Sequence, residues 1–139
     1  MKRIDALRGL SSDHHRALVI AKKAKHASDQ GDAALIRLWT EIEQAYAAEL
    51  ERHFTIEEQY LSAPLTEIGE TALVERLHEE HRQLRAHFQP GAPRNLDALH
   101  AFGDLLANHV RFEERELFNT AQERLSADLL SALEQAYSA

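Results

Sequence analysis

The sequence predicts an all-α protein, an antiparallel up-down four-helix bundle with a short C-terminal fifth helix. Three observations carry this prediction. Good helix formers, namely Ala, Leu, Glu, Arg and Gln, fill most of the 139 positions, with only five glycines and three prolines. Three short breaks divide the chain into four long stretches. In each stretch apolar residues recur at steps of three and four, which is typical of a helix with one buried face.

The breaks define the expected helices in order. They lie at Ser28–Asp32, Ser62–Pro64 and Gln89–Pro93, where glycine, proline and small polar residues gather. The long helices are therefore expected near 4–27, 32–61, 66–88 and 95–118, with a shorter one near 126–137. No segment alternates for long enough to predict a strand. We expect one domain over residues 1–139.

Helix starts are expected where a short polar side chain can accept a hydrogen bond from the first turn. Asp32, Thr66 and Asn95 are the expected caps of the second, third and fourth helices, and Ser126 is that of the short fifth helix.

Composition excludes several classes of protein. The net charge of −7 argues against nucleic acid as the main partner. The absence of cysteine excludes disulfides, thiolate zinc sites and iron–sulfur clusters. No apolar run approaches about 18 residues, so no membrane span is expected. The N-terminal stretch has no long apolar run and does not predict a secretory signal. A cytoplasmic location is the expectation.

Histidine interrupts the apolar stripe of every long helix. The chain has nine histidines but only three tyrosines and one tryptophan. His14 lies between Leu10 and Leu18 where an aliphatic residue would otherwise pack, and three more stripe histidines are His53, His81 and His109. One polar residue on a buried stripe is common, but one in each of four helices is not explained by core packing. Four such faces turned inward predict polar groups that meet in the core.

Two of these histidines are followed four residues later by glutamate, as His53–Glu57 and His109–Glu113. This spacing places both side chains on one helix face, one turn apart. Imidazole nitrogen and carboxylate oxygen suit iron, manganese, zinc or copper. Without a cation, two buried carboxylates would repel one another and lose hydration. The paired pattern therefore predicts a site with more than one metal ion.

The candidate ligands are His14 or His15, with His53, Glu57, His81, His109 and Glu113, and with His78 as an addition. Helical phase favours His14, because His15 lies about 100° away around the helix. Glu58 and Glu114 directly follow two candidate ligands. We expect them to be exposed or to contact ligands rather than the metal.

Four stretches in order carry a resemblance to a known family: Ser12–Leu18, His53–Leu61, Leu77–Leu84 and His109–Phe118. With them the chain resembles the hemerythrin-like, or HHE cation-binding, domain family. The resemblance implies an antiparallel four-helix bundle that holds a non-haem di-iron centre. Two carboxylates and an oxo or hydroxo group would bridge the two iron ions.

Carried over by position, Glu57 and Glu113 would be the bridges. The terminal ligands would be His53, His81 and His109 with one of His14 and His15, since the family spacing to Leu18 accepts either. Oxygen-carrying hemerythrins have His-x-x-x-His on the third helix, whereas here Leu77 precedes His81 and the nearer histidine is His78. The resemblance therefore favours iron handling, sensing of O2 or NO, or repair of iron centres over reversible oxygen carriage.

The expected function is that of a metal-binding, non-haem di-iron protein that binds or senses O2 or NO or handles iron, with zinc or manganese as substitutes. A di-iron redox enzyme acting on peroxide, O2 or NO is one alternative. The sequence shows no further acid–base residue, so an enzyme is less favoured. A metal-free helical interaction module is another. The expected partner is a diatomic ligand or iron, with no nucleic acid and no membrane, and the oligomeric state is left open.

Overall fold

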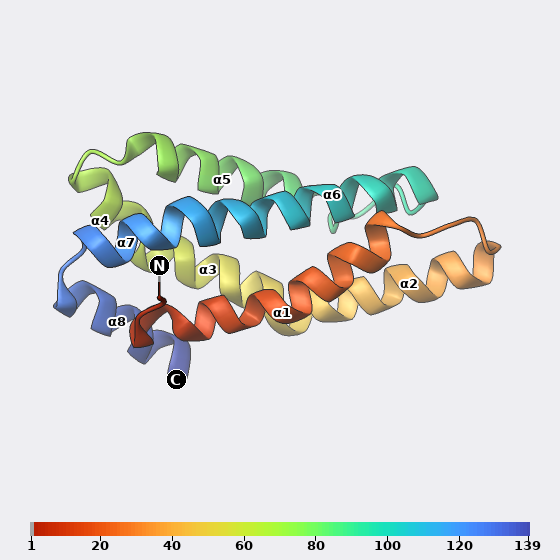
Figure 1. Ribbon diagram of the computed structural model, residues 1–139. Helices are drawn as coiled ribbons and strands as arrows, with labels where there is room; N and C mark the ends of the chain where they lie inside the picture. The colour runs from red at the N-terminus through yellow and green to blue at the C-terminus, as the bar shows by residue number, and fades with distance from the viewer. Residues whose placement is uncertain (1) are drawn as a thin grey trace.

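Four long helical rods form the molecule, and the all-α prediction is confirmed. The computed structural model describes residues 2–139, and no strand occurs in that range. The rods lie side by side (Figure 1). They are α1 (Asp5–Lys25), α2 (Asp32–Ala45) continued through the π-helical turn η1 (Tyr46–Leu50) into α3 (Glu51–Tyr60), α5 (Thr71–Ala86), and α6 (Leu96–Phe112) continued through the π-helical turn η2 (Glu113–Leu117) into α7 (Phe118–Arg124).

Two short helices complete the fold. The first, α4 (Ser62–Glu67), connects α3 to α5, and the second, α8 (Ala127–Ser138), is the expected C-terminal helix. It packs against α1 and α3 near the end of the bundle where the N-terminus also lies (Figure 1). No helix within residues 2–139 is both long and apolar enough to cross a membrane.

Two of the four expected caps are confirmed. The Asn95 side chain accepts a hydrogen bond from the Ala98 amide at 2.8 Å, and the Ser126 hydroxyl accepts one from the Leu129 amide at 3.2 Å. The prediction for Asp32 is wrong, because Asp32 is the first helical residue of α2. The chain turns before it at Gly31, whose φ of +92° suits glycine.

The connection between the second and third rods also differs from the prediction. Ser62–Pro64 forms the first turn of α4 rather than a loop, and Thr66 lies inside α4 rather than capping α5. Proline is tolerated there because first-turn amides need no partner within the helix. The chain instead turns at Gly69, with φ of +90°. The fourth rod continues to Arg124, beyond the predicted end at 118.

The core is apolar at both ends and polar in the middle. One apolar cluster lies toward the α1–α2 loop and the other toward α4 and α8. Along α1, Leu10 belongs to one cluster and Ala17 to the other, with buried His14 between them. Leu18, expected on the buried stripe, is instead 43 % exposed. The other rods show the same sequence of apolar, polar and apolar residues along their buried faces. A buried polar layer therefore crosses the bundle.

The rods α1 and α6 approach each other closely at Gly103. A Cβ atom at that position would lie 2.5 Å from the backbone nitrogen of Lys25 and 2.8 Å from the carbonyl oxygen of Ala21. Glycine is therefore required for this contact. The close packing fixes the position of α1 relative to the rod that carries His109.

Candidate metal centre

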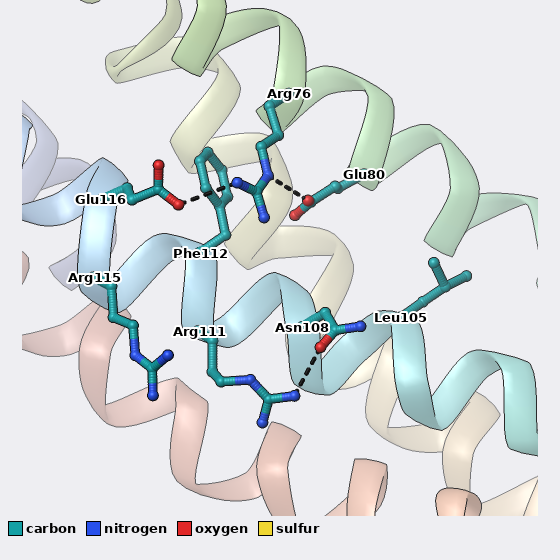
Figure 2. Close-up of a pocket in the computed structure, with 8 residues that line it drawn as sticks. All are labelled: Arg76, Glu80, Leu105, Asn108, Arg111, Phe112, Arg115 and Glu116. Carbon is teal, nitrogen blue, oxygen red and sulfur yellow. Dashed lines mark hydrogen bonds and ion pairs between the residues drawn. The ribbon is translucent and has the colours of Figure 1, made fainter.

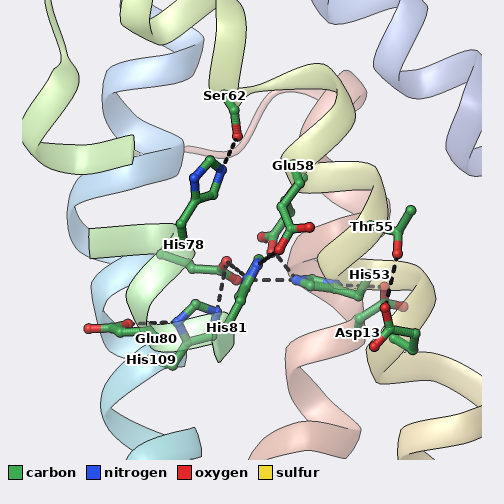
Figure 3. Close-up of polar contacts among 12 residues, drawn as sticks. Asp13, His53, Thr55, Glu58, Ser62, His78, Glu80, His81 and His109 are labelled. Carbon is green, nitrogen blue, oxygen red and sulfur yellow. Dashed lines mark hydrogen bonds and ion pairs between the residues drawn. The ribbon is translucent and has the colours of Figure 1, made fainter. Parts of the chain in front are cut away.

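Six polar side chains from all four rods meet in the buried layer, and each is at most 5 % exposed. They are His14, His53, Glu57, His81, His109 and Glu113. The other two candidates lie outside this cluster. His15 is exposed on α1. His78 is exposed on α5, where its Nε2 shares a hydrogen bond of 2.7 Å with the Ser62 hydroxyl (Figure 3).

The Glu113 carboxylate contacts histidines from three rods. Its Oε1 lies 2.8 Å from His14 Nε2 and 3.2 Å from His53 Nε2. Its Oε2 lies 3.0 Å from His109 Nε2, one helical turn earlier. A single carboxylate thus faces imidazoles on both sides of the bundle axis.

The Glu57 carboxylate lies between two histidines in the same way. Its Oε1 is 3.0 Å from His81 Nε2, and its Oε2 is 3.0 Å from His53 Nε2. The cluster contains two groups of candidate ligands, and within each group the ligand atoms all lie within 4.8 Å of one another. These groups share Glu113 and consist of Glu57, His81, His109 and Glu113 on one side and His14, His53 and Glu113 on the other.

Several of these buried atoms have no hydrogen-bond partner among residues 2–139. They are Glu57 Oε2, His109 Nε2 and Glu113 Oε2, which lie close to other cluster atoms but without hydrogen-bond alignment. Leaving a buried polar atom unsatisfied costs about 1–3 kcal/mol, and native interiors contain few such atoms. A cation among imidazole nitrogens and carboxylate oxygens would satisfy all three. The residues present therefore fit a metal such as iron, manganese or zinc.

Each cluster histidine points Nε2 inward and donates its Nδ1–H to a carboxylate outside the cluster, and Figure 3 labels the pairs of His53, His81 and His109. The pairs are His14 with Glu114 at 2.7 Å, His53 with Asp13 at 3.0 Å, His81 with Glu58 at 2.6 Å and His109 with Glu80 at 2.6 Å. Metal-ligating histidines are held by such contacts, which fix the tautomer and the ring orientation. The arrangement directs each Nε2 toward the Glu57 and Glu113 carboxylates, where a cation would take the place of protons.

All four outer carboxylates are sequence neighbours of cluster residues. Glu58 and Glu114 follow cluster glutamates and contact the candidate ligands His81 and His14, which is one of the two placements expected for them. Sequence reasoning missed Asp13 and Glu80, which precede His14 and His81 in the same way. A residue one position away lies about 100° around its helix, so it faces the neighbouring rod.

Arginines hold three of these outer carboxylates. Arg76 donates to Glu80 at 2.8 Å and to Glu116 at 3.1 Å, and its guanidinium lies 4.2 Å from the centre of the Phe112 ring (Figure 2). The other two pairs are Arg85 with Glu58 at 2.6 Å and Arg3 with Glu114 at 3.1 Å. Charge-assisted contacts of this kind fix the carboxylates that orient the histidines.

The cluster strongly favours positive charge. Burial alone would lower the pKa of His14, but its hydrogen bonds to Glu113 and Glu114 outweigh burial and raise that pKa to about 9. The same balance raises the pKa of His81 to about 10. Burial would raise the pKa of Glu113, but charged His109 and nearby hydrogen bonds hold it well below its usual value. Without a metal ion, protons therefore supply the positive charge.

A cavity of about 10 Å³ adjoins the cluster. Its polar wall includes His14, His53, His109 and Glu113, and its apolar wall includes Ala17, Leu50, Phe54, Leu106 and Val110. A cavity of about this size holds roughly one water-sized molecule. The cavity therefore admits only a very small ligand next to the cluster.

Comparison with known proteins agrees with this geometry. The family model for the hemerythrin HHE cation binding domain matches residues 5–121, a range that contains all six cluster residues. Comparison with curated proteins and with solved structures gives no match. The match covers most of the chain and confirms the resemblance predicted from the four motifs. The chain belongs to the hemerythrin HHE cation-binding domain family.

Proposed function

We propose that this protein holds two non-haem iron ions and binds a diatomic ligand, O2 or NO, beside them. The observation that carries the proposal is the convergence of four histidine Nε2 atoms, in two pairs, on two buried carboxylates. In this proposal His14 and His53 would hold one ion and His81 and His109 the other, while the Glu57 and Glu113 carboxylates would be shared by both.

Burial supports this choice of ligands. His14 rather than His15 reaches Glu113, and exposed His78 bonds to Ser62. Leu77, one turn before His81, is fully buried and offers no ligand atom. The ion beside His81 would therefore have two protein histidines, which favours a role other than reversible oxygen carriage.

The residues around the site bind and orient, and they exclude water. Bound iron would supply redox chemistry and open coordination positions. The outer carboxylates hold each Nδ1–H so that Nε2 faces the ions. Apolar side chains such as Phe54 and Leu106 line one wall of the cavity, and its size limits the ligand to a small molecule.

The cavity also limits the alternative of a redox enzyme, because only a substrate as small as O2, NO or peroxide fits beside the cluster. Sustained turnover, rather than binding of one ligand per site, would favour the enzyme.

We also propose that residues 1–139 form one domain, because α8 packs on α1 and α3.

Reconstitution with ferrous iron under anaerobic conditions tests the proposal. After removal of unbound metal, the protein should retain two iron ions per chain and develop near-ultraviolet absorption on exposure to O2 or NO. The variants His15→Ala and His78→Ala should retain both ions, whereas Glu113→Ala should lose them. Less than one iron per chain, or full retention in Glu113→Ala, contradicts the proposal. Reversible iron loading without binding of O2 or NO would instead support iron handling. Tighter retention of zinc or manganese than of iron would replace iron by that metal in the proposal.

A further inference from the structure

The C-terminal helix α8 lies beyond the matched range 5–121, yet one of its side chains contacts Asp13, an outer carboxylate of the buried cluster. We propose that Tyr137 is a positioning residue that acts through Asp13 on His53, so that α8 sets the metal affinity of that half of the centre. The inference rests on the proposed function, because it assigns His53 as a metal ligand.

Four contacts connect α8 to the buried carboxylates. The Tyr137 hydroxyl donates to Asp13 Oδ1 at 2.8 Å. Asp13 Oδ2 accepts from His53 Nδ1 at 3.0 Å. His53 Nε2 then lies 3.0 Å from Glu57 Oε2 and 3.2 Å from Glu113 Oε1. A shift of the Tyr137 hydroxyl would therefore be transmitted to the orientation of the imidazole.

The Tyr137 ring is held firmly enough to transmit such an effect. A Cβ atom at Gly9 of α1 would lie 2.3 Å from Cε1 of the ring, so the ring packs directly on the α1 backbone. From α3, the Arg52 guanidinium lies 5.0 Å from the ring centre and donates to the Ala136 carbonyl oxygen at 3.2 Å. The ring is thus packed against the two rods that carry Asp13 and His53.

The outer partner of Asp13 differs from those of the other three outer carboxylates. Arginines neutralise Glu58, Glu80 and Glu114, whereas Asp13 accepts from a neutral hydroxyl. A neutral donor orients Asp13 but leaves its negative charge directed at the imidazole. A more strongly polarised imidazole is a more basic ligand. His53 also lines the small cavity, together with His14 and His109, so Tyr137 acts on one of the three histidines beside which a ligand would bind.

Removal of one hydroxyl tests the proposal. Tyr137→Phe keeps the ring on Gly9 and loses only the bond to Asp13. Tyr60→Phe is the matched control, because its hydroxyl makes no hydrogen bond within residues 2–139. Affinity for Co²⁺ is measured on the full chain by competition with a chelator. Tyr137→Phe should weaken one of the two sites about fivefold, less than the 10–100-fold typical of losing a directly bonded carboxylate. Tyr60→Phe should match the wild type.

A double-mutant cycle separates positioning from general packing. If Tyr137 acts through Asp13, adding Tyr137→Phe to Asp13→Asn should change Co²⁺ affinity less than about twofold. The variant Gly9→Ala, which displaces the ring but keeps the hydroxyl, should weaken the same site. An equal loss with and without Asp13→Asn overturns the proposal, as does wild-type affinity in Tyr137→Phe.

A measurement without metal keeps this inference distinct from the proposed function. In the metal-free protein, the Nδ1–H proton of His53 should give a downfield NMR signal in isotope-labelled histidine. Tyr137→Phe should shift this signal, and Tyr60→Phe should not. An unshifted signal in Tyr137→Phe overturns the positioning role. Absence of metal binding in the wild type would contradict the proposed function, while the proton signal would still decide whether Tyr137 positions His53.

Discussion

Replacing Glu80 by glutamine tests how the outer carboxylates support the centre. Glu80 Oε1 accepts from His109 Nδ1 at 2.6 Å, and its other oxygen accepts from Arg76 at 2.8 Å. The substitution preserves the size of the side chain and one acceptor oxygen. It removes the negative charge that polarises the imidazole. The affinity of the centre for iron should therefore fall without loss of the fold.

The magnitude follows from the contact. Losing such a partner typically weakens metal binding 10–100-fold, and a charge-assisted hydrogen bond is about twice as strong as a neutral one. The amide oxygen of the introduced glutamine would still accept a hydrogen bond, and the Glu80 side chain is 19 % exposed, so solvent reduces the effect. We expect the low end of the range, a loss of about tenfold or ~1.4 kcal/mol.

The preceding residue provides a matched control. Glu79 lies on the same helix and pairs with Arg82, as Glu80 pairs with Arg76, but it is exposed and does not contact His109. Iron affinity of Glu80→Gln and Glu79→Gln is compared by anaerobic chelator competition at one pH. The reasoning is refuted if the two variants bind iron within about twofold of each other, well inside the range expected for losing a ligand's partner.

Three further predictions follow from the site and its packing. The pKa values of His14 and His81 are raised from 6.5 to about 9 and about 10 in the folded, metal-free protein. Protonation of these two histidines therefore contributes its full stabilisation below pH 6.5. This contribution should be lost as the pH rises through 9 and 10, and urea unfolding of the metal-free protein that shows no loss would contradict the prediction. Metal binding should tighten over the same pH range, because the metal displaces these protons. His14→Ala should reduce bound iron to about one ion per chain by elemental analysis, whereas His15→Ala should retain both, and equal loss would refute the assignment. Gly103→Ala should cost about 1–3 kcal/mol in denaturant unfolding because its Cβ would meet the α1 backbone, and unchanged stability would show that the rods can separate.

Local periodicity accounts for what could be predicted from the sequence. A histidine on an apolar stripe must face the core if its helix does, so the buried cluster follows from spacing within each helix. Helical phase also favoured His14 over His15 as the inward-facing residue, although both stayed candidate ligands, and only His14 is buried. The family, the all-α class and the short fifth helix were predicted from local motifs and spacing, and all three are confirmed.

Features that depend on how helices pack against each other could not be predicted in this way. Asp13 and Glu80 look like ordinary surface acids until the rotation of the neighbouring rods is known. The helix that carries Tyr137 was expected, but its docking on α1 depends on a close contact at Gly9. Pro64 suits both a loop and a first helical turn, so local sequence does not distinguish them. The π-helical turns could not be predicted either, because a spacing of three or four residues between apolar positions tolerates one extra residue.

Anomalous scattering at the iron edge, on crystals of protein reconstituted with ferrous iron, tests the central claim most directly. The account predicts two iron peaks per chain in the buried polar layer. One should lie against the Nε2 atoms of His14 and His53 and the other against those of His81 and His109, with Glu57 and Glu113 between them. A single peak, no peak in the layer, or iron bound at exposed His15 or His78 would contradict it.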